Sequence, residues 1–210
     1  MSSERLDAFD RFNSLIHFET VDSEKLAVEH YDLFSAGSDQ IWAMRKFARN
    51  ERWAYLQFAL PSQRIALSPS LGVSESSIIR RKRLASYLKN FDSVSVREEN
   101  GADLIFAATG KRVPVLCDPT LVVPKDQWCS LSDDRLVPRG PYVFSYLLGE
   151  DNAEANETLK YVTDGGKIPV LSLSDRERNG ELPAGPAEFL ALIDNASHVI
   201  TDSFHAAVLV

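Results

Sequence analysis

Short apolar runs that end in turns of small or charged residues recur along this chain, and helical periodicity follows most of them. The turns lie at residues 37–39, 68–72, 97–98, 118–120 and 201–205. A repeated order of strand, turn and helix is typical of α/β proteins with open parallel sheets. Because such sheets bind ligands beyond the carboxyl ends of their strands, we expect these turns to gather at ligand-binding edges.

The last of these turns follows a β-branched apolar run and leads directly into an alanine-rich segment. The pattern predicts a buried strand, a tight turn and the start of a helix. Backbone N–H groups at a helix start favour anions, and an imidazole there can donate to the same anion. His205 and Ser203 are therefore candidate ligands of a phosphate or carboxylate. A lone histidine near a strand end is more often a packing or surface residue, so this hypothesis depends on the convergence of the other turns.

The turn at residues 37–39 has the composition expected between a strand and a helix. Gly37 permits backbone conformations that other residues resist, while Ser38 and Asp39 are natural helix caps and hydrogen-bond acceptors. We consider Asp39 equally compatible with a plain helix cap and with a ligand site. Gly37 and Ser38 are candidate substrate-binding residues.

Charged residues end the strands predicted at residues 93–96 and 113–117. Arg97 suits an anionic ligand, because a guanidinium can grip a carboxylate or phosphate through two parallel hydrogen bonds. Glu98 is a candidate catalytic carboxylate that can also pair with Arg97 or a neighbouring lysine. Asp118 is a candidate substrate-binding residue, but it begins an Asp-Pro-Thr turn, which is a common structural turn. For Glu98 and Asp118 we rank a structural role ahead of a catalytic one.

Composition excludes several classes of protein. The net charge of −7 argues against general affinity for nucleic acid or for anionic membrane surfaces. The two cysteines form no CxxC pair and no metal-ligand cluster, so we expect no disulfide framework, metal site or cofactor, and a reducing cytoplasm fits. We find no signal peptide and no apolar run of transmembrane length. The oligomeric state stays open.

The order of the predicted elements indicates two α/β units. We place an N-terminal unit at residues 1–124, a proline-bearing linker at 125–140 and an incomplete C-terminal unit at 141–210. The N-terminal unit is expected to begin with an amphipathic helix over residues 2–18 and a short helix at 24–28. Further along, the prediction includes an apolar helix stripe at Leu84, Tyr87, Leu88 and Phe91, and a helix that ends at Gly110.

Several short motifs together resemble the polysaccharide pyruvyl transferase family. They are GSDQIW at residues 37–42, SVRE with a following glycine at 95–101, DPT at 118–120, and a PxEFL helix followed by TDSFH at 201–205. Their order and spacing are similar to those of that family from about Phe9 to the end of the chain. The resemblance implies a two-domain fold similar to GT-B glycosyltransferases.

The resemblance also implies a reaction. Phosphoenolpyruvate would be the donor, two hydroxyls of a sugar or glycan-lipid would be the acceptor, and the product would be a pyruvate ketal with release of phosphate. In the family, an arginine matching Arg97 and a histidine matching His205 are associated with donor binding. Asp39 and Glu98 are then the first candidates for the base, and we expect both units to face one cleft.

Family members usually extend beyond this chain on both sides, so we expect a chain truncated at both ends.

Two other functions stay open. A nucleotide-sugar glycosyltransferase would use the same architecture, although the sequence lacks a run of glycine and basic residues for a diphosphate. A non-catalytic remnant in a glycan-synthesis assembly is the third reading.

Overall fold

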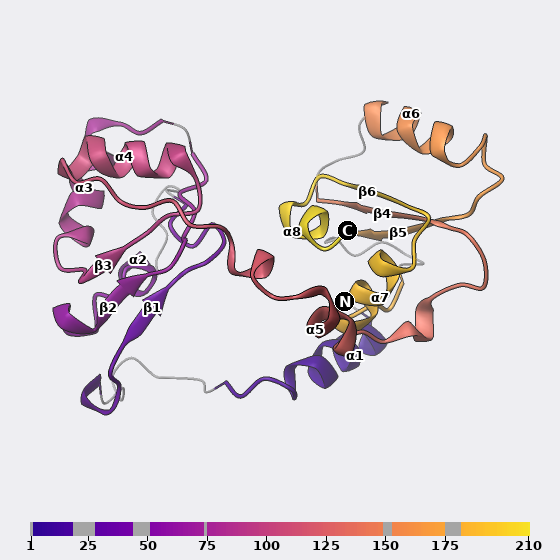
Figure 1. Ribbon diagram of the computed structural model, residues 1–210, viewed down its shortest axis with the longest axis horizontal. Helices are drawn as coiled ribbons and strands as arrows, with labels where there is room; N and C mark the ends of the chain where they lie inside the picture. Colours follow the sequence, from indigo (N-terminus) through magenta and orange to yellow (C-terminus); the bar gives the residue numbers. More distant parts are fainter. Residues whose placement is uncertain (1, 19–27, 44–50, 74, 149–152, 175–181) are drawn as a thin grey trace. The chain divides into compact units, whose positions relative to one another are not determined.

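The computed structural model describes residues 2–18, 28–43, 51–73, 75–148, 153–174 and 182–210 of the 210-residue chain (Figure 1). These residues form a mixed α/β fold whose strands make two three-stranded sheets, and every strand pair is parallel. The chain divides into two compact units. We call residues Thr20–Val122 the central unit, and Met1–Glu19 together with Val123–Val210 the terminal unit.

The central unit has the strand order β1-β2-β3. Its elements are β1 (Phe34–Ala36), β2 (Arg64–Ala66), β3 (Ser93–Val94), α2 (Glu51–Ala54), α3 (Ile78–Leu88) and α4 (Glu99–Thr109), with 3₁₀ turns at Val28–His30, Pro61–Gln63 and Pro119–Leu121. Helix α3 connects β2 to β3 and packs against α4. The strand predicted at residues 113–117 is reduced to one parallel bridge between Val96 and Val115.

The limits of these two helices follow from their terminal residues. The hydroxyl of Ser77 accepts a hydrogen bond from the backbone N–H of Arg80 and caps α3. Helix α4 ends at Gly110, whose φ of 72° is the left-handed conformation that glycine adopts without strain. The predicted end of this helix is therefore confirmed.

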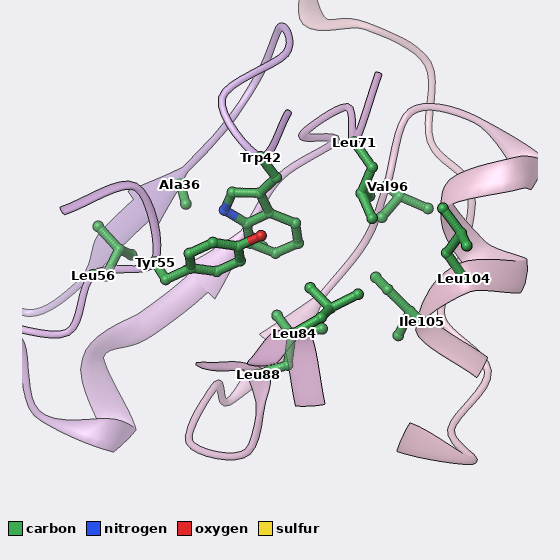
Figure 2. Close-up of a cluster of buried hydrophobic side chains, with 11 residues drawn as sticks. Ala36, Trp42, Tyr55, Leu56, Leu71, Leu84, Leu88, Val96, Leu104 and Ile105 are labelled. Carbon is green, nitrogen blue, oxygen red and sulfur yellow. The ribbon is translucent and has the colours of Figure 1, made fainter. Parts of the chain in front are cut away.

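Aromatic and aliphatic side chains from the strands, helices and loops of the central unit pack together in one core (Figure 2). The ring of Trp42 is buried and stacks on the ring of Tyr55, with the ring centroids 5.0 Å apart. The ring of Tyr55 stacks in turn on that of Tyr87, with a centroid distance of 4.5 Å. The indole N–H of Trp42 donates to the carbonyl oxygen of Ala54 at 2.9 Å. The predicted stripe on α3 is confirmed, because Leu84 and Leu88 are buried in this core and Tyr87 and Phe91 pack against it. Trp42 thus anchors the loop that follows β1.

The terminal unit has the strand order β5-β4-β6. Its elements are β4 (Val143–Leu147), β5 (Val170–Ser174), β6 (His198–Thr201), α1 (Ser3–Asn13), α5 (Lys125–Ser130), α6 (Ala153–Val162), α7 (Pro186–Asp194) and α8 (Phe204–Val208), with a 3₁₀ turn η4 at Asp134–Leu136. Helices α1 and α5 and the turn η4 contact α7 (Figure 1). The short helix predicted at residues 24–28 lies outside the described residues except for Val28.

The contacts divide the chain differently from the boundaries expected from the sequence. Residues 1–19 group with the C-terminal half and not with the segment that follows them. Much of the stretch expected as a linker, 125–140, forms α5 and η4 on the surface of α7. Polar composition suggested a linker, but here the polar residues form capped turns, such as the carboxylate of Asp133 accepting from the N–H of Arg135.

Helix α1 contacts α7 most closely at Ala8, the buried residue of the helix. Phe9 and Phe12, on the apolar face of the helix, are half-buried, and Leu6 is 49% exposed. A Cβ atom added to Gly185 would lie 2.8 Å from Ala8. The small residues at these two positions therefore let α1 contact the start of α7.

A buried carboxylate joins three segments of the terminal unit. Glu188 on α7 is 1% exposed, and its Oε1 lies 3.1 Å from the guanidinium of Arg11 and 2.9 Å from that of Arg135. Its Oε2 accepts from the backbone N–H of Gly185 at 2.9 Å. Glu188 therefore caps its own helix and fastens both α1 and η4 to it.

Replacing Glu188 with glutamine should lower the free energy of unfolding by about 2 kcal/mol, because the ion pairs with Arg11 and Arg135 lose the negative charge of the carboxylate. The estimate stays at the low end of the range, since both arginine side chains are about half exposed and solvent screens the pairs. Urea unfolding of the wild type and the variant measures the difference. Glu154→Gln on the exposed face of α6 is the matched control and should change stability by less than about 0.5 kcal/mol. Equal midpoints and slopes for all three proteins would contradict the role of Glu188.

Candidate active site

The carboxyl ends of the central unit's strands place the predicted turns at one edge of the sheet. Residues 37–39 follow β1, 68–72 follow β2, and 97–98 follow β3. Because the three strands are parallel and adjacent, these turns come together. The structure brings six of the predicted site residues into this region, namely Gly37, Ser38, Asp39, Arg97, Glu98 and Asp118.

The centre of this region is an ion pair between Arg97 and Asp118. Nη1 of Arg97 donates a hydrogen bond to Oδ2 of Asp118, with 2.8 Å between the two atoms. The arginine side chain is only 13% exposed. The hydroxyl of Ser38 donates to the same carboxylate oxygen at 3.0 Å. The backbone N–H and the hydroxyl of Thr120 both donate to Oδ1, at 3.0 and 2.8 Å. Asp118 thus accepts hydrogen bonds on both oxygens.

The environment keeps Asp118 ionised. Burial raises its pKa, but the hydrogen bonds from Arg97, Thr120 and Ser38 together outweigh burial and hold the pKa well below the usual aspartate range. Asp118 itself is 1% exposed. Its carboxylate therefore orients the Arg97 guanidinium, which makes Asp118 a positioning residue in this geometry.

The turn at residues 37–39 is fixed by backbone geometry that only glycine allows. Gly37 has a φ of 137°, and a Cβ atom there would lie 1.9 Å from the carbonyl oxygen of Leu67. The backbone N–H of Ser70 donates to the carbonyl of Asp39 at 2.7 Å, which joins this turn to the one after β2. Ser38 and Asp39 are consequently held beside Arg97.

The carboxylates beside Arg97 differ in exposure. The Asp39 side chain is 70% exposed, and its Oδ1 lies 3.8 Å from Nη1 of Arg97. Glu98 is 32% exposed, with Oε2 at 3.8 Å from Nε of Arg97. Its Oε1 accepts from the N–H of Leu71 at 2.9 Å and from the hydroxyl of Ser70 at 3.0 Å. Glu98 thus fastens the turn after β2, whereas Asp39 is the more accessible carboxylate.

The turn at residues 201–205 lies in the terminal unit and has the predicted strand, turn and helix. The hydroxyl of Thr201 accepts from the N–H of Ser203, and the hydroxyl of Ser203 caps α8 by accepting from the N–H of Ala206. Oδ1 of Asp202 accepts from the N–H of Leu148 at 2.7 Å, which ties the turn to the end of β4. His205 lies in the first turn of α8 and is half-buried.

Arg97 and His205 belong to different units, so the expected shared cleft stays a prediction. Thr120 and Ser70 also belong to the site in the central unit, and the sequence predicted no role for either. Thr120 was visible as part of the Asp-Pro-Thr turn, in which an aspartate commonly accepts from the residue two positions later. Ser70 had no such local signal, because its partner Glu98 is distant in sequence.

In the part of the chain that the structure describes, no group of three or more histidine, cysteine, aspartate or glutamate side chains could hold a metal ion. No described helix combines the length and apolar character needed to cross a membrane.

The fold and the site define an α/β protein with an arginine-centred polar site at the carboxyl edge of a parallel sheet. The family model described as polysaccharide pyruvyl transferase matches residues 3–209. The chain therefore belongs to the polysaccharide pyruvyl transferase family, which is a transferase family whose acceptor is a sugar or polysaccharide. Neither the curated proteins nor the solved structures contain a match to this chain.

Proposed function

We propose that this protein transfers the three-carbon group of phosphoenolpyruvate to two hydroxyls of one sugar in a polysaccharide or its precursor. Two carbon–oxygen bonds form at the second carbon of the donor, its methylene becomes a methyl group, and the bond to phosphate breaks. The products are a pyruvate ketal and inorganic phosphate. The observation that carries the proposal is the Arg97 guanidinium, which Asp118 holds in one orientation beside the exposed carboxylate of Asp39.

Donor binding requires a group that recognises two anions close together. Phosphoenolpyruvate carries a carboxylate and a phosphate, and a planar guanidinium matches either through paired hydrogen bonds. Because Asp118 restrains Arg97 before the ligand arrives, less side-chain entropy is lost on binding. Arg97 is accordingly the proposed donor ligand, with Ser38 and the Gly37 turn as its supports.

The reaction also needs a proton for the methylene carbon and a base for the attacking hydroxyl. We assign the base to Asp39, whose carboxylate is the most exposed of the three carboxylates around Arg97. His205 is the proposed acid or phosphate ligand, since imidazole changes charge near neutral pH. Glu98 is the second candidate for the base, through its Oε2 atom.

An assay of phosphate release tests the proposal. The protein is incubated with phosphoenolpyruvate and a panel of oligosaccharide or glycan-lipid acceptors, and parallel reactions contain nucleotide-sugars in place of the donor. We expect acceptor-dependent phosphate release and a mass increase of the acceptor that matches a ketal. Turnover of a nucleotide-sugar alone would refute the proposal and support a glycosyltransferase.

Replacing His205 with alanine should weaken phosphoenolpyruvate binding by about tenfold, through loss of one charge-assisted hydrogen bond. Calorimetric titration of the donor into both proteins gives the affinity, and thermal unfolding reports whether the fold is intact. His198→Ala, at the exposed start of β6, is the matched control and should bind normally. If His205→Ala unfolds early but binds the donor normally below its melting temperature, His205 is only a packing residue.

A further inference from the structure

The central unit contains a second concave site, at the opposite end of β3 from Arg97. A cavity of about 470 Å³ is lined by the last turns of α3 and α4, the start of β3 and the segment after α4. Ser93 and Val94 line the cavity, and Arg97 lies three residues beyond Val94, about 10 Å further along the extended chain. Because none of the candidate site residues lines this cavity, it is separate from the proposed transferase site.

The floor of this cavity is apolar. Leu88 and Ile105 are almost fully buried and belong to the core cluster, and Phe91 and Val113 pack against it. A volume of this size is within the range of pockets that hold small organic ligands. Filling it with an apolar group would remove these side chains from water, which favours binding.

The rim of this cavity is predominantly cationic. Lys89, Lys111 and Arg112 line it, with Asp92 as the opposing carboxylate. Among the described residues, neither lysine forms an ion pair with a carboxylate, and the Arg112 guanidinium lies over the Phe106 ring at 4.8 Å. A group of three cations beside an apolar floor complements a ligand with one acidic end.

We propose that this cavity binds a small amphipathic anion. Its apolar part fills the space between the ends of α3 and α4, and its phosphate, sulfate or carboxylate head lies against Lys89, Lys111 and Arg112. Lysine and arginine side chains suit this arrangement, because their alkyl stems extend an apolar surface while their charged ends reach the head group. The site does not depend on the proposed transfer reaction.

Octyl phosphate is the probe for the test, used below its micelle concentration in calorimetric titrations. Octyl glucoside has the same tail with a neutral head, and inorganic phosphate has the head without a tail. We expect saturable binding of octyl phosphate and binding of the other two that is at least about tenfold weaker. Equal affinity for octyl phosphate and octyl glucoside would overturn the proposal, as would the absence of octyl phosphate binding.

Variants distinguish a ligand site from basic residues that merely suit helix ends. Lys111→Gln combined with Arg112→Gln should weaken octyl phosphate binding by about tenfold or more, and Ala108→Phe should block the cavity. Lys82→Gln, on an exposed part of α3 away from the cavity, should bind like the wild type. Thermal unfolding shows that each variant is folded. If the double variant loses stability while its folded form keeps wild-type affinity, the cations serve the helix C-termini and the proposal is wrong.

Discussion

Replacing Arg97 with lysine is expected to weaken phosphoenolpyruvate binding by about tenfold to a hundredfold. This range corresponds to the loss of a charge-assisted, bidentate pair of hydrogen bonds to the donor. Lysine keeps the positive charge, so a simple electrostatic attraction would survive. It lacks the planar donor pair, and its ammonium group cannot reproduce the contact with Asp118 while also gripping the donor. Calorimetric titration of phosphoenolpyruvate into the wild type and the variant gives the ratio.

A matched substitution separates this effect from a general loss of charge or fold. Arg139→Lys changes an exposed arginine of the same chain and should leave donor affinity unchanged. Thermal unfolding shows whether Arg97→Lys is folded at the titration temperature. Folded Arg97→Lys with wild-type donor affinity would show that Arg97 does not contact the donor.

Replacing Asp118 with asparagine should produce the largest loss of stability, about 3 kcal/mol, because the mostly buried Arg97 loses its nearest opposing charge and the carboxylates of Asp39 and Glu98 are more distant and more exposed. Donor binding should weaken as well, since the guanidinium is no longer restrained. Thr109→Val is the control: its hydroxyl donates to the carbonyl of Ile105 and accepts from the exposed N–H of Lys111, and the loss of these neutral hydrogen bonds should cost about 1 kcal/mol or less. Urea unfolding and donor titration of both variants provide the comparison.

A double-variant cycle tests whether Asp118 acts through Arg97. If it does, Asp118→Asn added to Arg97→Lys should weaken donor binding much less than it does in the wild type. Additive losses of donor affinity would mean that Asp118 affects binding by another route.

The depressed pKa of Asp118 also predicts how this contribution depends on pH. A carboxyl whose folded pKa lies below its unfolded value stabilises the fold fully above the unfolded pKa of about 4, and loses that contribution as the pH falls towards the folded pKa. The stability difference between the wild type and Asp118→Asn should therefore be constant above about pH 5 and shrink at lower pH. A difference that grows with acidity would contradict an ionised Asp118.

Local chemistry was enough to predict much of the site in the central unit. Gly37, Ser38 and Asp39 were recognisable because a strand that ends in small polar residues is a turn by backbone geometry alone. Arg97 and Asp118 were recognisable because each follows an apolar run. Parallel strands then bring such ends together whatever the details of packing, and the contacts of Arg97 with Asp39 and Asp118 agree with that expectation.

Other features depended on contacts between residues distant in sequence. The amphipathic pattern near the N-terminus predicted a helix. Its position depends on the close contact between Ala8 and Gly185 and on the ion pair between Arg11 and Glu188. Polar residues at 125–140 have the composition of a linker, yet they form α5 and η4 because α7 offers a surface and a buried carboxylate to pair with. Composition carries no record of which surface a segment will meet.

The sequence by itself determined the α/β class, the strand-to-turn junctions and the family, because periodicity, glycine requirements and motif spacing are properties of neighbouring residues. Only the tertiary structure decided the arrangement of the charged groups around Arg97. It made Asp118 the buried support for the guanidinium, engaged Glu98 Oε1 with the turn after β2, and left Asp39 exposed. The reason is physical: burial and hydrogen-bond partners set the state and accessibility of a carboxylate, and both arise from segments that meet only when the chain folds.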